Sequence, residues 1–215
     1  FTSVDKNQAD DTKIKLKKYV DTCIVLNTEY SGLLKKIYLN VAGFVWALKT
    51  GLKMSNYIVG EYDFTIKKIE KEIQNQKFDA VLFEYWHAHK TIKIFRQKNI
   101  PTILDMHNIL WRSYESQVKR KKWIPKFIKK WSVKRYRQFE QMIWKKFDGI
   151  ISINDKESEY VKNILRNRCI IECIPMGIDF NKWTFKREIT TPQRVGYYGG
   201  LGSIHNQGSA KFCYQ

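Results

Sequence analysis

The chain alternates between short apolar runs, which are typical of buried strands, and longer segments with apolar residues at helical spacing. The apolar runs predict strands at residues 1–4, 21–26, 79–85, 100–104, 149–153 and 169–174. The periodic segments predict helices at residues 5–18, 33–49, 64–74, 91–97, 108–118, 124–147 and 156–165. This alternation is typical of a parallel sheet covered by helices on both faces. The sequence therefore predicts an α/β fold with a doubly wound parallel sheet.

The alternation stops at Pro175, and the segment from Pro175 to Pro192 has few periodic apolar residues. Residues 176–192 are expected to form an interdomain linker, which separates a first domain at 1–175 from the start of a second at 193–215. In this second part an apolar run at 194–198 leads into Gly199, Gly200 and Gly202. A glycine turn between a strand and a helix lets backbone amides approach a phosphate, although the same turn also occurs with no ligand. The second domain is expected to be truncated.

Residues 101–108, Pro-Thr-Ile-Leu-Asp-Met-His-Asn, carry the strongest indication of a site. An apolar strand pattern ends there in Asp105, His107 and Asn108. Ligands of open α/β sheets bind outside the carboxyl ends of the strands, so chemistry is expected at this edge. The alternative is an ordinary helix start, with Asn108 as the N-cap and His107 as a partly buried loop residue.

A second polar group, Glu84-Tyr-Trp-His87-Ala-His89, follows another predicted strand. It predicts the rim of an acceptor pocket, with Glu84 and His87 as polar contacts and Trp86 as a stacking surface. A solvated loop explains the same pattern. Two histidines and one carboxylate without further ligands do not support a metal site, so no metal is expected.

The net charge of +18 over 215 residues indicates an anionic partner, such as nucleic acid, a phosphosugar or acidic lipid. Residues 119–146 hold twelve Lys or Arg and a single acid, Glu140. An apolar stripe in this segment is expected to pack in the core: Trp123, Ile124, Phe127, Ile128 and Trp131. The basic face is either solvated or in contact with an anionic membrane, through Lys119, Arg120, Lys121, Lys122, Trp123 and Lys126. Nucleic acid is less favoured because no RNA-binding signature is present.

The four cysteines include Cys169 and Cys173, which share one face of a predicted strand, and two buried, reduced thiols are the simplest interpretation. The longest near-apolar stretch, residues 37–48, is too short to span a membrane, which takes about 20 apolar residues. No secretory signal opens the chain. These features predict a cytoplasmic location, and the basic helix favours peripheral attachment to the inner face of the membrane.

Several segments, taken in order, resemble the retaining glycosyltransferases of family 4, which have the GT-B fold of two Rossmann-like domains. The matching segments are Phe-Asp-Ala-Val-Leu-Phe-Glu at 78–84, Ile-Leu-Asp-Met-His-Asn at 103–108, Phe-Asp-Gly-Ile-Ile-Ser-Ile at 147–153, Ile-Pro-Met-Gly-Ile-Asp at 174–179 and Val-Gly-Tyr-Tyr-Gly-Gly at 195–200. The resemblance implies that residues 1–175 belong to the acceptor-side domain and that residues 193–215 begin the donor domain.

The resemblance also implies roles for individual residues. His107 would be the catalytic residue, lining the cleft near the transferred sugar, and Glu84, Trp86, His87, Asp105 and Asn108 would bind the acceptor. Gly199, Gly200 and Asn206 would bind the nucleotide-sugar donor, with no metal and no other cofactor. The acceptor would be a glycan or a lipid-linked intermediate. The family's first strand and helix and its later donor-site residues are absent, so this chain alone is expected to be inactive. The alternative is a non-catalytic basic α/β module that binds an anionic membrane or nucleic acid.

Overall fold

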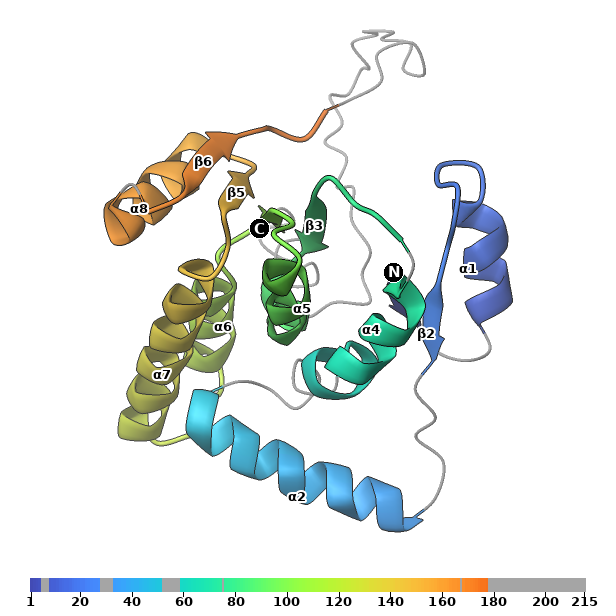
Figure 1. The fold of residues 1–215 in the computed structure, drawn as a ribbon. Coiled ribbons are helices and arrows are strands. Elements are labelled where there is room, and N and C mark those ends of the chain that lie inside the picture. The colour runs from blue at the N-terminus through green and yellow to red at the C-terminus, as the bar shows by residue number, and fades with distance from the viewer. Residues whose placement is uncertain (5–7, 28–32, 52–58, 75, 167, 178–215) are drawn as a thin grey trace, which may run out of the picture. The chain divides into compact units, whose positions relative to one another are not determined.

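The computed structural model describes residues 1–4, 8–27, 33–51, 59–74, 76–166 and 168–177 (Figure 1). Its first half contains β1 (Thr2–Val4), α1 (Ala9–Leu16), β2 (Val25–Asn27), α2 (Leu33–Thr50), the π-helical turn η2 (Val59–Asp63) and α4 (Ile66–Ile73). It continues with β3 (Val81–Glu84), the 3-10 helix η3 (Trp86–Thr91), α5 (Ile92–Gln97), β4 (Thr102–Met106), α6 (Leu110–Lys119), α7 (Lys126–Trp144), β5 (Gly149–Ser152), α8 (Asp155–Leu165) and β6 (Ile170–Cys173).

Two parallel sheets organise these elements. The larger has the strand order β3-β4-β5-β6, and the smaller pairs β1 with β2. In the larger sheet, Phe83, Leu104, Ile150 and Ile171 pair in register across the four strands, and all four are buried. They form one row of the hydrophobic core, which also takes in side chains from α5, α7 and α8. The prediction of a parallel α/β fold is confirmed.

Helices cover only one face of the larger sheet in the described part of the chain. The strand order advances by one position each time, and right-handed crossovers then place every connecting helix on the same face. On the other face Leu82 is 53% exposed and Ile170 is 71% exposed. The expected second helical layer is therefore not among the described residues. The reversal of strand order that defines a doubly wound sheet is also not seen within this sheet.

The predicted strands and helices of residues 1–174 occur where the apolar pattern placed them, with shifts of a few residues at their ends. The largest change is at the second strand, which was expected over residues 21–26 and forms at Val25–Asn27. The chain divides into two units, residues 1–176 and 177–215. This boundary is next to the expected start of the linker. The linker after residue 177 and the start of the second domain lie outside the described residues.

Helix α7 and the residues just before it correct one prediction. Trp123, Phe127 and Trp131 are 79%, 74% and 43% exposed, so the expectation that this stripe packs in the core is wrong. The apolar positions further along the helix meet the core, because Tyr136 and Ile143 are buried. The amino-terminal part of α7 thus presents aromatic residues to solvent together with its basic residues.

Cys173 of β6 and Cys169, just before this strand, are half-buried rather than buried. Cys169 and Cys173 are free thiols of intermediate exposure, as is Cys23. The prediction that these thiols are unpaired agrees with the structure, whereas the prediction of a fully buried pair was wrong. Cys213 lies outside the described residues.

Candidate functional site

Two carboxylates stand side by side at the carboxyl ends of β3 and β4. Glu84 is the last residue of β3 and pairs in register with Asp105 of β4. Side chains alternate between the two faces of a strand, and Phe83 and Leu104 point into the core. Glu84 and Asp105 therefore lie on the face of the sheet that the described helices leave open. His107, two residues beyond Asp105, joins them at this edge.

His107 is held at the surface by close neighbours. Its Nε2 atom lies 2.7 Å from Oε2 of Glu84 and 3.9 Å from Oδ2 of Asp105. The ring also packs against that of Tyr85, with 4.9 Å between the ring centroids and 33° between the planes. The side chains of His107 and Glu84 remain 42% and 62% exposed. The imidazole is thus oriented by the protein and accessible from solvent.

Tyr85 has an unusual backbone conformation between β3 and η3. Its φ of 62° and ψ of 162° fall in a region that is essentially restricted to glycine, where other residues cost about 1–3 kcal/mol. Its backbone N–H donates to the carbonyl oxygen of Asp105 at 3.1 Å, which extends the strand pairing by one residue. Burial, followed by the nearby charges of Glu84 and Asp105, raises the pKa of its phenol. The strained turn places the tyrosine ring beside His107.

The cluster of Glu84, Asp105 and His107 offers hydrogen-bond acceptors and possible metal ligands. One ligand atom from each residue lies within 4.8 Å of the others. A divalent cation could be held by such a set, although exposed carboxylates commonly gather without one. The carboxylate oxygens can equally accept hydrogen bonds from sugar hydroxyls. Among the described residues, Asp105 and His107 gather with Glu84 in this way, whereas His87 and His89 do not.

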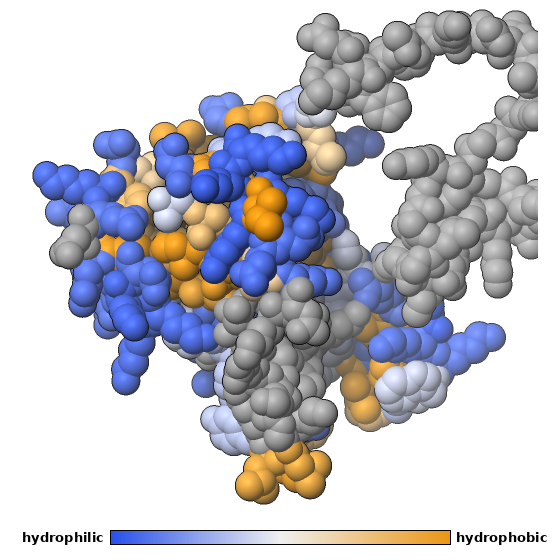
Figure 2. Space-filling view, turned by 90° about the vertical axis from the view of Figure 1, so that its right-hand side faces the viewer, coloured by the Kyte–Doolittle hydropathy of each residue, from blue (hydrophilic) through white to orange (hydrophobic). Residues whose placement is uncertain are grey.

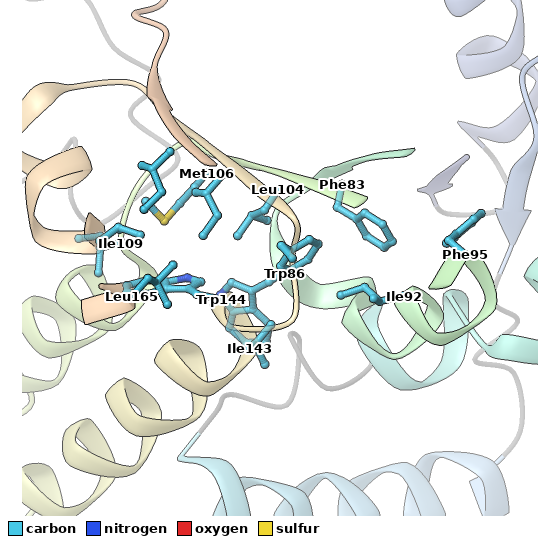
Figure 3. Packing of buried hydrophobic residues seen from close by; sticks show 14 of the residues in the cluster. Phe83, Trp86, Ile92, Phe95, Leu104, Met106, Ile109, Ile143, Trp144 and Leu165 are labelled. Carbon is cyan, nitrogen blue, oxygen red and sulfur yellow. The ribbon is translucent and has the colours of Figure 1, made fainter. Parts of the chain in front are cut away.

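The structure corrects the interpretation of Trp86 as a stacking surface at a pocket rim. The side chain is 1% exposed and lies in the core, where Figure 3 shows it beneath Leu104 and close to Ile143. Its indole Nε1–H donates to Oε1 of Glu140 at 3.1 Å. The interpretation of residues 84–89 as a solvated loop is wrong for the same reason. From Trp86 onward the chain forms the 3-10 helix η3 (Trp86–Thr91), which turns Trp86, His89 and Thr91 inward.

The two histidines of η3 are uncharged structural residues. The ring of His87 lies 5.9 Å from that of Tyr85 and 4.9 Å from that of Trp86. Burial lowers the pKa of His87 to about 4. Burial, together with the positive charges of Lys146 and Lys90, lowers the pKa of His89 to about 4. Neither side chain joins the carboxylate cluster, although His87 remains next to Tyr85.

Asn108 does not cap the following helix, as one interpretation of the sequence held. Helix α6 begins at Leu110, and its amides are bound by carboxylates from distant segments. Glu140 accepts from the N–H groups of Leu110 at 3.1 Å and Trp111 at 2.8 Å. The N–H of Ile109 donates to Glu157 at 3.3 Å. Asn108 is half-buried, and its Oδ1 atom has no hydrogen-bond partner.

Glu140 has a structural role that the sequence did not predict. It is fully buried, and burial raises its pKa to about 7 against the opposing effect of its three N–H donors. Its isolation as the single acid among twelve basic residues in 119–146 was the available signal. A lone acid in a strongly basic segment indicates a specific partner. The partners, in η3 and α6, could not be named from the sequence.

Two cavities lie beside Tyr85 and His87. One of about 170 Å³ is lined by Glu84, Tyr85 and His87 with apolar side chains of β3 and α4. The other, of about 200 Å³, is lined by Tyr85 and His87 together with Leu110, Ser113, Tyr114, Gln117 and Tyr136. Tyr85 and His87 therefore separate two spaces at the end of β3. Several residues that line the second space carry hydroxyl or amide groups.

The remaining residues that were predicted as membrane or donor contacts are either exposed or lie outside the described part of the chain. Lys119, Arg120, Lys121, Lys122, Trp123 and Lys126 are all exposed. Gly199, Gly200 and Asn206, the predicted donor contacts, lie outside the described residues. None of the described helices is both long enough and apolar enough to cross a bilayer.

Comparisons with models of protein families, with curated proteins and with solved structures found no match to this chain.

Proposed function

We propose that this chain is the acceptor-side part of a glycosyltransferase that moves a sugar, with retention, from a nucleotide-sugar to a glycan or lipid-linked acceptor. In this proposal His107 contacts the transferred sugar, and Glu84 fixes the orientation of its ring. Asp105 and Glu84 accept hydrogen bonds from sugar hydroxyls. The donor diphosphate is bound by backbone amides at Gly199 and Gly200, with Asn206 nearby. The resemblance of the segments at 78–84, 103–108 and 147–153 to family 4 supports this assignment.

The observation that carries the proposal is the solvent-accessible contact between His107 and Glu84 at the ends of adjacent parallel strands. Histidine–carboxylate pairs that only support a core are buried, whereas this one leaves both side chains substantially exposed. It lies at the sheet edge where open α/β folds bind ligands. The strained backbone of Tyr85 beside it is also typical of functional sites.

The test is an assay of the full-length protein against a panel of nucleotide-sugars, with nucleotide release and acceptor labelling as readouts. We expect His107→Ala to lower kcat by about a hundredfold or more, since a lost transition-state contact commonly costs that much. Glu84→Gln is expected to lower kcat less, because the imidazole remains while its carboxylate partner is neutralised. The matched control is Glu72→Gln, an exposed carboxylate on α4.

Far-ultraviolet circular dichroism of each variant separates a catalytic loss from unfolding. Wild-type turnover by a folded His107→Ala protein would remove His107 from the site. The absence of binding to every nucleotide-sugar tested would contradict the assignment as a whole.

The exposed aromatic and basic residues of α7 favour a second candidate, a non-catalytic module that binds polyanions. Trp123 and Phe127 are exposed among lysines, and Nζ of Lys121 lies 5.9 Å from the centroid of the Trp123 ring. Strong retention by an anionic surface, together with no affinity for nucleotide-sugars, would favour this module over the enzyme.

A further inference from the structure

Helix α2 exposes its apolar face and buries the other one. Six large apolar residues on one side of the helix are 49–83% exposed: Leu34, Ile37, Val41, Phe44, Val45 and Leu48. At 3.6 residues per turn they cover an arc of about 100°. We call these six residues the α2 face. Figure 2 shows a hydrophobic patch at the lowest point of the described surface, and α2 is the lowest element in Figure 1. Apolar surface of this extent on one helix marks an interaction site.

The opposite side of α2 fixes the helix to the rest of the chain, so the exposure does not come from an unattached helix. Leu39, Gly43 and Thr50 are buried. Near the carboxyl end, Trp46 packs edge-on against Phe139 of α7 at 5.7 Å. Nη2 of Arg135 donates to the carbonyl oxygen of Lys49 at 2.6 Å. The α2 face is held pointing away from α7.

The aromatic residues at the start of α7 form a second exposed apolar surface. Trp131 lies one helical turn before Arg135, the residue that binds the end of α2, and it is 43% exposed. Phe127 lies one turn earlier and is 74% exposed. Exposed apolar and aromatic side chains thus occur on both α2 and the amino-terminal half of α7, two helices that are joined by direct contacts. Tryptophan beside lysine is typical of segments at the boundary between head groups and acyl chains.

The charges near this surface indicate which kind of partner would bind it. Helix α2 contains Lys35, Lys36 and Lys49 but no acidic residue. On the flank of α7 away from α2, a cavity of about 270 Å³ is lined by Lys119, Lys126, Lys129 and Lys130 with one carboxylate, Glu115. Pairing of two copies through α2 would bring like charges together. Exposed apolar residues with basic neighbours, namely Lys49 at the end of α2 and Lys121, Lys122, Lys126 and Lys130 around Trp123 and Phe127, are instead complementary to an anionic bilayer.

We propose that the α2 face and the exposed aromatic residues of α7 dock together on an anionic membrane surface. The helix lies in the plane of the interface, with its apolar residues among the acyl chains and its lysines at the head-group phosphates. It does not span the bilayer, since α2 has 18 residues, includes three lysines and is not apolar enough to cross. The inference does not depend on sugar transfer and holds for either candidate function.

Vesicle flotation of the full chain tests this docking. We expect binding to vesicles that contain phosphatidylglycerol and weak binding to pure phosphatidylcholine vesicles, with the difference reduced by salt. Phe44→Glu combined with Val41→Glu should lower the partition coefficient by about tenfold or more, because two apolar contacts are lost and two like charges are added. The matched control is Ile14→Glu, which changes a residue of α1 that is 69% exposed and should leave binding unchanged.

Each result of this experiment has a defined meaning. Loss of vesicle binding in the α2 variant, with a normal circular dichroism spectrum and normal binding by Ile14→Glu, supports the proposal. Binding that ignores lipid charge, or that is unaffected by the α2 substitutions, overturns it. A dimer in light scattering that Phe44→Glu dissociates, with no vesicle binding, would show that a second copy covers the face. If the double variant fails to fold, Phe44→Ser is used in its place.

Discussion

At the scale of single residues, Glu140 joins three parts of the chain. Its carboxylate accepts from the indole of Trp86 in η3 and from two backbone N–H groups at the start of α6, while its own backbone belongs to α7. Buried N–H groups left without acceptors cost about 1–3 kcal/mol each, so this carboxylate keeps η3 and α6 in place. Since η3 follows Tyr85 directly, the position of the candidate site depends on this buried interaction.

The raised pKa of Glu140 makes its contribution dependent on pH. The folded protein holds this proton up to a pKa of about 7, whereas the unfolded chain releases it near 4.5. Between these values the folded state binds more protons, so the stability of the wild type falls as pH rises. The decrease expected across the window is about 3 kcal/mol at 1.4 kcal/mol per pKa unit. Glutamine cannot titrate, so Glu140→Gln should lack this component.

Chemical unfolding of the wild type and of Glu140→Gln at a series of pH values measures the effect. The difference between the two proteins isolates Glu140 from the buried histidines, which titrate in both. We expect the wild type to lose stability relative to the variant from pH 4.5 to pH 7 and no further change above that. A difference that stays constant with pH would contradict the raised pKa.

The sequence pattern located Glu84, Asp105 and His107 more accurately than their surroundings. Asp105 and His107 were predicted from the end of an apolar run, and Glu84 from the end of another, and the register of β3 and β4 brings them together. Trp86 was placed at a rim and is in the core. Its partner Glu140 is 54 positions away, and local patterns carry no information on contacts at that separation.

At the scale of elements, apolar periodicity located the helices but did not decide which side would be buried. The stripe at residues 123–131 and the positions from Tyr136 onward both have helical spacing, yet only the latter contact the core. Periodicity in α2 likewise predicted a helix without indicating that its apolar side would face outward. When a helix has two apolar sides, or one apolar side that the core does not need, its sequence does not show which side is buried. The neighbouring elements decide this.

The join between α2 and α7 depends on a glycine. Gly51 follows α2 with a φ of +76°, and its N–H donates to the carbonyl oxygen of Ala47 at 2.7 Å. A Cβ atom at this position would lie 2.5 Å from the carbonyl oxygen of Ser132 in α7. We therefore expect Gly51→Ala to destabilise the protein by roughly 2 kcal/mol or more, from backbone strain and from displacement of α2.

Urea unfolding provides the measurement, and Gly177→Ala provides the matched control. A Cβ atom on Gly177 would have no neighbour within 4 Å, so this control should change the stability by less than about 0.5 kcal/mol. Equal stability of the Gly51→Ala protein and the control would mean that the contact between α2 and α7 tolerates a side chain at its closest point.

At the scale of the whole molecule, the two faces of the larger sheet differ in burial, and basic residues outnumber acidic ones. The buried residues of the larger sheet lie on one face, whereas Glu84 and Asp105, the neighbours of His107, lie on the opposite face. The chain bears 39 Lys and Arg against 21 Asp and Glu. The strand pattern predicted the sheet itself, whereas the open face could not be foreseen, because apolar residues such as Leu82 and Ile170 occur there too. An alternating pattern does not show whether a second layer is present.

The excess of positive charge predicts that salt stabilises this protein. Lysine–carboxylate pairs in the described residues are exposed and local, such as Lys15 with Asp11 and Lys119 with Glu115, and such pairs contribute little. Repulsion is evident at Lys146, where burial first and then the charges of Arg96 and Lys90 lower the pKa. Sodium chloride shortens the Debye length from about 30 Å at 0.01 M to about 8 Å at 0.15 M, which screens this repulsion.

We therefore expect the Tm in thermal unfolding to rise by about 2–4 °C over this range of salt, which corresponds to about 1 kcal/mol for a chain of this size. Replacing two exposed lysines, Lys122→Gln with Lys130→Gln, should reduce the response, because less repulsion remains to be screened. Replacing an exposed acid, Glu70→Gln, should increase it. A Tm that falls with salt would show that attractive ion pairs outweigh the repulsion. The same screening that stabilises the fold should weaken attachment to an anionic bilayer, so stability and vesicle binding are expected to change in opposite directions as salt is added.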